Sequence, residues 1–325
     1  MRIMYIHDRK QQRKETDMIY TVTLNPAIDY FITLKDELMV DEVNRGTGEL
    51  FKAGGKGLNV SKTLSVLGVC SKAVALLGGF TGTFIRDAFK DDENIGIMPV
   101  WIEGNNRINL KAMYDHKALC INGTGPSVTE ADRKQILDLF SAADAEDKVV
   151  ISGSMMPGLD EEFLTELSDV IHGRGAGLVI DMETLSPGTL MRCAPELIKP
   201  NLYELGLILG RDDLDVSNAA EALDGLVGSG IGAVLLSLGR DGAMYADGRE
   251  RLRLTHPDTV LVNKVGAGDA MLAAFLGMKE KGMDVRQALR YGGAAGNATA
   301  SKLEDITAVD IEKFLPLMKV VEMQR

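Results

Sequence analysis

Short apolar runs alternate with amphipathic stretches of helical period along most of this 325-residue chain, and few folds accommodate that order. The runs with strand character cover 19–24, 73–77, 148–152, 178–181 and 233–237. The stretches with helical character cover 57–67, 129–141, 160–173, 202–209, 217–228, 267–281, 284–301 and 307–319. Strand–helix–strand units of this size pair their strands in parallel and place helices over the sheet. The alternation therefore predicts an α/β fold with a mostly parallel sheet covered by helices on both faces.

Two segments, 26–53 and 95–122, interrupt this rhythm with alternating polar and apolar residues. They predict antiparallel strands inserted between the strand–helix units, which together form a small sheet over one end of the main domain. A lid of this kind suits an enzyme that must exclude water. The chain has no internal repeat or long linker, so we expect residues 18–325 to form a single domain. Residues 1–17 are basic and lack the apolar core of a secretory signal, and we expect them to lie outside the fold.

The net charge of −11 argues against nucleic acid or an anionic membrane surface as a partner, because phosphate backbones require clustered cations. No uncharged apolar run is long enough to span a bilayer. The three cysteines lie far apart and form no C-x-x-C pair, which fits a reducing compartment. We therefore expect a cytoplasmic protein that binds neither nucleic acid nor membrane. The four histidines show no metal-ligand spacing.

The strongest local motif is the segment Val-Gly-Ala-Gly-Asp-Ala-Met at 265–271, which an apolar helical stretch follows directly. Glycines at 266 and 268 let an anion approach the backbone, and the amides of a helix start bind phosphate. A carboxylate at Asp269 fits such a site if it takes the proton from an attacking hydroxyl. An isolated motif of this kind has a simpler interpretation, since Asp also favours a helix N-terminus.

A second motif, Lys-Pro-Asn-Leu-Tyr-Glu-Leu at 199–205, allows two interpretations. Asn201 and Glu204 have the spacing of a capping box at a helix start. Their oxygens also suit Mg²⁺ or the water molecules around it, because Mg²⁺ prefers oxygen ligands and keeps several waters. The two interpretations are compatible.

A third motif, Ala-Gly-Gly-Lys-Gly-Leu-Asn at 53–59, predicts a backbone turn against a ligand, with Lys56 and Asn59 directed at it. Asp29, Arg107 and Asn109 in the interrupting segments add polar groups of the kind that bind sugars. Arg107 is suited to hold a phosphate with its planar fork of donors. Each of these residues taken alone is more often an ordinary surface residue.

Motifs of several other nucleotide enzymes are absent. The chain contains no G-x-x-x-x-G-K-[ST] of a P-loop and no G-x-G-x-x-G of a dinucleotide site. Protein-kinase elements and a G-x-S-x-G elbow are also absent. Two alternatives remain from other classes: a nucleotide-dependent oxidoreductase on a similar sheet, and a sugar-phosphate sensor without catalysis.

Taken together, the motifs resemble those of the ribokinase-like sugar kinases, specifically the phosphofructokinase-B group. The resemblance runs in order from residue 23 to about 301, through TLNPAID, GGKGLNVSKTLSVLG, LLGGFTGTFI, RIN, SGSMMPG, IKPNLYEL, SLGRDGAM and VGAGDAMLAAF. It implies a ribokinase-like fold with ATP and Mg²⁺. By this resemblance the catalytic base is Asp269, the anion hole is Gly266, Ala267 and Gly268, and the magnesium residues are Asn201 and Glu204. The sugar-phosphate residues it implies are Asp29, Gly55, Lys56, Asn59, Arg107 and Asn109. The nucleotide residues it implies are Ser237, Gly239, Arg240, Gly242, Gly268 and Asn297.

Within that group, the lysine of GGKG and the segment R-I-N-x-K resemble 1-phosphofructokinases and tagatose-6-phosphate kinases. The resemblance implies phosphorylation of a ketohexose phosphate, with fructose 1-phosphate favoured and tagatose 6-phosphate or fructose 6-phosphate as alternatives. It also implies a homodimer through the lid. Three segments depart from the usual pattern, namely 116–122, 181–184 and 263–264. The first two are expected to alter the wall of the active site.

Overall fold

The computed structural model describes residues 18–115, 117–262 and 265–323. The strands of the large sheet are β1 (Ile19–Thr23), β4 (Ser71–Leu77), β5 (Ile95–Trp101), β8 (Lys148–Gly153), β9 (Gly177–Met182), β10 (Leu197–Ile198), β11 (Ala233–Ser237), β12 (Ala243–Asp247), β13 (Arg251–Thr255) and β14 (Lys319–Glu322). The strands of the small sheet are β2 (Ala27–Leu34), β3 (Gly46–Gly54), β6 (Arg107–Tyr114) and β7 (Lys117–Asn122). The helices are α1 (Lys56–Val66), α2 (Gly79–Asp87), α3 (Glu130–Phe140), α4 (Glu161–Gly173), α5 (Pro187–Cys193), α6 (Leu202–Leu209), α7 (Ala219–Gly228), α8 (Ala267–Glu280), α9 (Val285–Ala300) and α10 (Ala308–Phe314).

The large sheet has the order β14-β13-β12-β11-β10-β9-β8-β1-β4-β5 in the described part of the chain. Its strands from β11 to β5 pair in parallel, and only β12, β13 and β14 are antiparallel to their neighbours. The predicted α/β fold with a mostly parallel sheet is confirmed. The antiparallel edge was not predicted: β12 and β13 follow short turns that leave no room for a crossover helix, and β14 joins the edge only after α8, α9 and α10.

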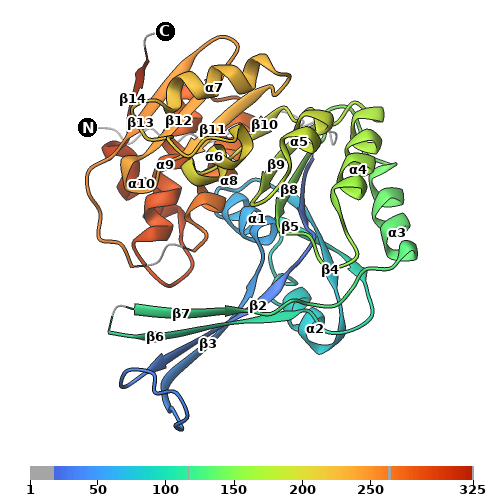
Figure 1. Cartoon of the computed structure of the whole chain (residues 1–325), viewed down its shortest axis with the longest axis vertical. Coiled ribbons are helices and arrows are strands. Elements are labelled where there is room, and N and C mark those ends of the chain that lie inside the picture. The colour runs from blue at the N-terminus through green and yellow to red at the C-terminus, as the bar shows by residue number, and fades with distance from the viewer. Residues whose placement is uncertain (1–17, 116, 263–264, 324–325) are drawn as a thin grey trace, which may run out of the picture.

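Helices cover both faces of this sheet, as predicted. One apolar core packs α3, α4, α5, α6 and α7 against the sheet, with Phe140 and Phe163 fully buried. The other packs α1, α8, α9 and α10 against the opposite face. Figure 1 shows these two groups of helices on either side of the strands. Of the described helices, none combines the length and apolar character that crossing a bilayer requires.

The small sheet projects from one end of the large one, as Figure 1 shows. It begins directly after β1, and its order is β3-β2-β6-β7. The predicted lid range 95–122 is too long, because β5 pairs with β4 in the large sheet. The expectation of antiparallel strands is also wrong in one place, since β2 and β6 pair in parallel.

Both errors have one cause, the helix α2, which the periodicity analysis missed. Its sequence GFTGTFIRD contains two glycines and two threonines, which have low helix propensity. With α2 in place, β4, α2 and β5 form an ordinary crossover unit. After β2 and β3, the chain therefore returns to the lid only when β5 is complete.

The helix predicted over 307–319 is also shorter than expected. It runs as α10 to Phe314 and ends in a 3₁₀ turn over Leu315–Leu317. Pro316 lacks the amide that a continuing helix requires. The following residues form β14 at the edge of the sheet.

Candidate active site

A cavity of about 310 Å³ opens at the carboxyl ends of β1 and β8, under the small sheet. Ligands of open parallel sheets bind at this edge. Its walls come from Thr23, Asn25, Ala27, Asp29, Gly55, Lys56, Asn59, Arg107, Asn109, Lys111, Cys120, Asn122, Ser152, Gly153, Ser154, Glu183, Val265 and Asp269. We call it the Asp269 cavity. The structure brings together here all six residues expected to bind a sugar phosphate, beside the expected base.

Asp269 occupies the first turn of α8 and is only 6% exposed. The Asn59 side chain donates a hydrogen bond of 2.8 Å from Nδ2 to its Oδ2. Burial, reinforced by the Asp181 carboxylate, raises the pKa of Asp269 to about 6, although Asn59 and Lys199 act in the opposite direction. A carboxylate with a pKa near neutrality is well matched to accept a proton in catalysis.

The start of α8, next to this carboxylate, has the features that would suit an anion. Gly266 precedes the helix with φ 81°, a left-handed conformation that favours glycine, and no side chain caps the helix there. A Cβ on Gly268 would lie 3.0 Å from the Lys199 ammonium, a tight contact that glycine avoids. The Lys199 ammonium therefore lies close to the backbone at Gly268.

Asp181 is a buried acid that the sequence analysis noted only as part of an altered segment. It precedes the last residue of β9, and neither of its side-chain oxygens makes a hydrogen bond to a described residue. Its Oδ1 lies 3.2 Å from Lys199 Nζ and 3.6 Å from Lys56 Nζ. A buried carboxylate needs such compensation. An Asp at the end of a buried strand, facing a ligand edge, was the available signal.

The lid contributes a second charged group. Asp29 Oδ1 accepts a hydrogen bond from Asn109 Nδ2 at 3.1 Å and lies 2.9 Å from Lys111 Nζ. Lys111 is 8% exposed and was not predicted as a site residue. It faces the cavity because it is two residues beyond Asn109, on the same face of β6.

Arg107 extends from the first position of β6 into the same cavity. Its guanidinium donates to the Asn25 carbonyl at 3.0 Å and to Ser154 Oγ at 3.5 Å, and no carboxylate is among its described partners. Its buried Nε has no described acceptor. Burial lowers the pKa of Arg107, although Asp29 and Glu183 oppose this. A buried cation with unused donors is suited to a phosphate.

Asn201 and Glu204 form the predicted capping box at the start of α6. Glu204 Oε2 accepts from the Asn201 amide at 2.8 Å, and Asn201 Oδ1 accepts from the Glu204 amide at 2.9 Å. Burial raises the pKa of Glu204 above its ordinary value, with Asn201, Lys56 and Lys199 opposing it. The capping interpretation is thus confirmed, and the metal interpretation remains a prediction.

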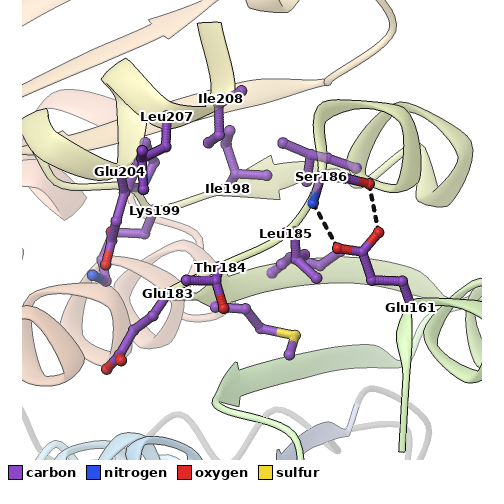
Figure 2. A pocket seen from close by; sticks show the side chains of 14 residues that line it. Glu161, Glu183, Thr184, Leu185, Ser186, Ile198, Lys199, Glu204, Leu207 and Ile208 are labelled. Carbon is purple, nitrogen blue, oxygen red and sulfur yellow. Dashed lines mark hydrogen bonds between the residues drawn. The ribbon is translucent and has the colours of Figure 1, made fainter. Parts of the chain in front are cut away.

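Glu204 also lines a second cavity, of about 280 Å³, which Figure 2 shows. We call it the Glu204 cavity. It contains Glu161, Ile180, Met182, Glu183, Thr184, Leu185, Ser186, Leu190, Ile198, Lys199, Pro200, Glu204, Leu207 and Ile208. Glu183 is the one residue that lines both cavities described here.

The residues expected to contact the nucleotide lie in three places, one of which is Gly268 in the first turn of α8. Ser237 ends β11 and forms a bridge with Asn201, while Gly239, Arg240 and Gly242 belong to the turn that follows. Asn297 lies on α9, where it donates to the Gly293 carbonyl at 2.9 Å and accepts from Thr259 Oγ1 at 3.0 Å. None of these five side chains lines the Asp269 or Glu204 cavity. Their role remains a prediction.

Three residues of the altered segments, at positions 116, 263 and 264, lie outside the described residues. Across 18–115, 117–262 and 265–323, no group of three or more acidic, histidine or cysteine side chains could hold a metal ion by itself.

Comparison with known proteins gives consistent results over nearly the whole chain. The family model described as pfkB family carbohydrate kinase matches residues 20–312. A 1-phosphofructokinase of Bacillus subtilis is 35% identical over 308 residues, covering 94% of this chain and 100% of the relative. A D-tagatose-1-phosphate kinase of Bacillus licheniformis is 36% identical over 299 residues, covering 90% and 96%. The crystal structure of phosphofructokinase-2 from Escherichia coli in complex with substrates and products superposes with a TM-score of 0.85 at 26% identity, covering 92% and 98%.

Proposed function

The chain belongs to the pfkB family of carbohydrate kinases, and on that premise we propose that it phosphorylates fructose 1-phosphate with ATP to give fructose 1,6-bisphosphate. The observation that supports this proposal is the set of side chains that line the Asp269 cavity. It combines a buried carboxylate suited to act as base with Arg107, a buried cation that has unused donors. Membership of a family of carbohydrate kinases favours a kinase over the two alternatives, an oxidoreductase and a non-catalytic sensor.

In the proposed reaction, the sugar phosphate binds with its phosphate at Arg107 and a free hydroxyl at Asp269. The hydroxyl oxygen forms a bond to the γ-phosphorus of ATP, the bond from that phosphorus to the β,γ-bridging oxygen breaks, and ADP leaves. The hydroxyl proton passes to an Asp269 carboxylate oxygen. The amides of 266–268 and the Lys199 ammonium offset the negative charge on the transferring group.

Mg²⁺ fits this site as an ion held largely through phosphate oxygens and water, because Mg²⁺ keeps several waters when it binds substrates. The observation that favours it is the Asp181 carboxylate, whose two buried oxygens lack hydrogen bonds to described residues. Asp181, Asn201 and Glu204 are the residues that would hold it. When bound, the ion supplies positive charge to the phosphate oxygens.

D-tagatose 1-phosphate is the second candidate substrate, supported by the relative of that name. Both candidates are ketohexoses with a phosphate on C1 and a free hydroxyl on C6. Both can therefore bind with the phosphate at Arg107 and the hydroxyl at Asp269. Tagatose 6-phosphate and fructose 6-phosphate would require the opposite placement, and we rank them lower.

The test is steady-state phosphorylation by Mg·ATP of four sugar phosphates and of unphosphorylated fructose. We expect the highest kcat/KM with fructose 1-phosphate, then tagatose 1-phosphate. A preference for a 6-phosphate would overturn the proposed substrate and keep the kinase class. Equal rates with unphosphorylated fructose would overturn the role of Arg107.

The raised pKa of Asp269 predicts an acid limb in the pH profile. The base must be deprotonated to act, so kcat/KM for the sugar should fall as pH drops below about 6 and be level above it. The phosphate of the substrate titrates in the same range. Asn59→Ser provides the control, since the lost hydrogen bond should raise the pKa of Asp269 and move the limb to higher pH. Identical limbs in the two proteins would assign the limb to the substrate.

We further propose a homodimer through the outer face of the lid. Phe51, Ile108 and Ile121 are 48%, 41% and 55% exposed there, and by strand register they lie on the face opposite Asp29 and Lys111. Exposed apolar rows on a two-faced sheet are covered in a stable protein. Analytical ultracentrifugation should show a dimer that Phe51→Glu converts to monomer. A monomeric wild-type chain at micromolar concentration would contradict this.

A cytoplasmic location also remains a proposal. Its support is that Cys70, Cys120 and Cys193 are free thiols and that the first two are exposed. Exposed thiols persist in a reducing compartment.

A further inference from the structure

Glu183 stands between the two cavities and belongs to the segment that departs from the usual family pattern. It follows directly after β9, and its side chain is 59% exposed. Figure 2 shows it on the same side of the Glu204 cavity as Lys199 and Glu204. The mechanism above gives this carboxylate no part in the reaction.

The partner of Glu183 is Lys56, one of the residues expected to bind the sugar phosphate. Glu183 Oε1 lies 3.4 Å from Lys56 Nζ, and Asp181 Oδ1 lies 3.6 Å from the same atom. Burial works to lower the pKa of Lys56, but Asp181, Asp269, Glu183 and Glu204 together raise it. The ammonium is therefore charged and already compensated by two carboxylates before any ligand binds.

Arg107 differs from Lys56 in this respect, because its described partners are a carbonyl and a hydroxyl. A sugar phosphate can bind Arg107 without breaking an ion pair. It can recruit Lys56 only by competing with a carboxylate. Asp181 is buried and also pairs with Lys199, so it is the carboxylate that stays. The Glu183 side chain is exposed, so it is the carboxylate that can move away from Lys56 when a phosphate binds.

We propose that Glu183 is a positioning residue that holds the Lys56 ammonium away from the anionic group of the substrate and thereby limits the affinity for phosphorylated sugars. The inference rests on the proposed function, since it assigns the Asp269 cavity to a sugar phosphate. Lys56 lines the Asp269 cavity, which the proposed function assigns to the sugar phosphate, so we expect the effect on binding of the sugar.

The test is Glu183→Gln, which keeps the shape of the side chain and removes its charge. We expect the KM for fructose 1-phosphate to fall about three- to fivefold, the size of one partly exposed ion pair. The kcat, the KM for ATP and the inhibition constant of unphosphorylated fructose should stay within about twofold. Glu312→Gln on α10 is the matched control, because it removes the same charge from an exposed position outside both cavities.

Three results would overturn the proposal. An unchanged KM for fructose 1-phosphate would make Glu183 an ordinary surface residue. A rise in KM for both fructose 1-phosphate and fructose would mean that Glu183 contacts sugar hydroxyls. A fall in the KM for ATP alone would assign it to the nucleotide. Calorimetric binding of fructose 1-phosphate without ATP separates this test from that of the proposed function, because it reports the effect of Glu183 whether or not turnover follows.

Discussion

Asp269→Asn should lower kcat with fructose 1-phosphate by about 10³-fold, within the range that general-base catalysis contributes. Asparagine keeps the size of the side chain and cannot take the proton of the attacking hydroxyl. The KM for the sugar should change little, because the phosphate is held by Arg107 at another part of the cavity. The measurement is kcat and KM at saturating Mg·ATP.

The same substitution carries its own control for folding. Asp269 is buried beside Asp181, and this repulsion is one cause of its raised pKa. Removing the charge should leave the melting temperature unchanged or raise it. A variant that melts normally and keeps more than about a tenth of the wild-type kcat would exclude Asp269 as the base.

Arg107→Met should lower kcat/KM for fructose 1-phosphate by about 10²-fold and leave the low activity on unphosphorylated fructose nearly unchanged. The lost interactions are charge-assisted hydrogen bonds to phosphate, each worth about 1.5–3 kcal/mol. Methionine fills much of the space of the arginine stem, so the wall of the cavity should persist. The comparison of the two sugars by kcat/KM is the measurement.

Arg107→Lys separates charge from geometry. Lysine keeps the positive charge and loses the planar fork, so this variant should lie between wild type and Arg107→Met. If both variants impaired fructose and fructose 1-phosphate equally, Arg107 would be a structural residue of the lid, bound only to the Asn25 carbonyl and Ser154.

Local patterns were sufficient for most of the fold. Strand and helix periods located the five predicted strands and the helices that cover them, because each element depends on contacts between near neighbours. The glycine-rich start of α8 and the capping box of α6 were also readable, since backbone conformation and capping are local. α2 was missed because its own residues favour a helix weakly and its packing against β4 decides its structure.

Site residues that belong to a sequence motif were predicted. Those that belong to the site only because the fold brings them close to it were missed. Lys111 is an ordinary charged residue in the sequence, and the one local signal for Asp181 is its place at the end of an apolar strand. Their meaning comes from what the fold places opposite them: Asp29 for Lys111, and two lysines for Asp181.

The sequence by itself determined the class of fold, the glycine-rich helix start that we propose as an anion site, and the acid beside it. The tertiary structure alone decided which charges compensate one another. Asn59 and Asp269 are 210 positions apart and yet hydrogen-bonded, and Lys56 meets Glu183 only because α1 and the end of β9 share one edge of the sheet. Periodicity and turn chemistry act over a few residues, whereas the electrostatics of a site depend on distances that only the packed sheet and lid establish.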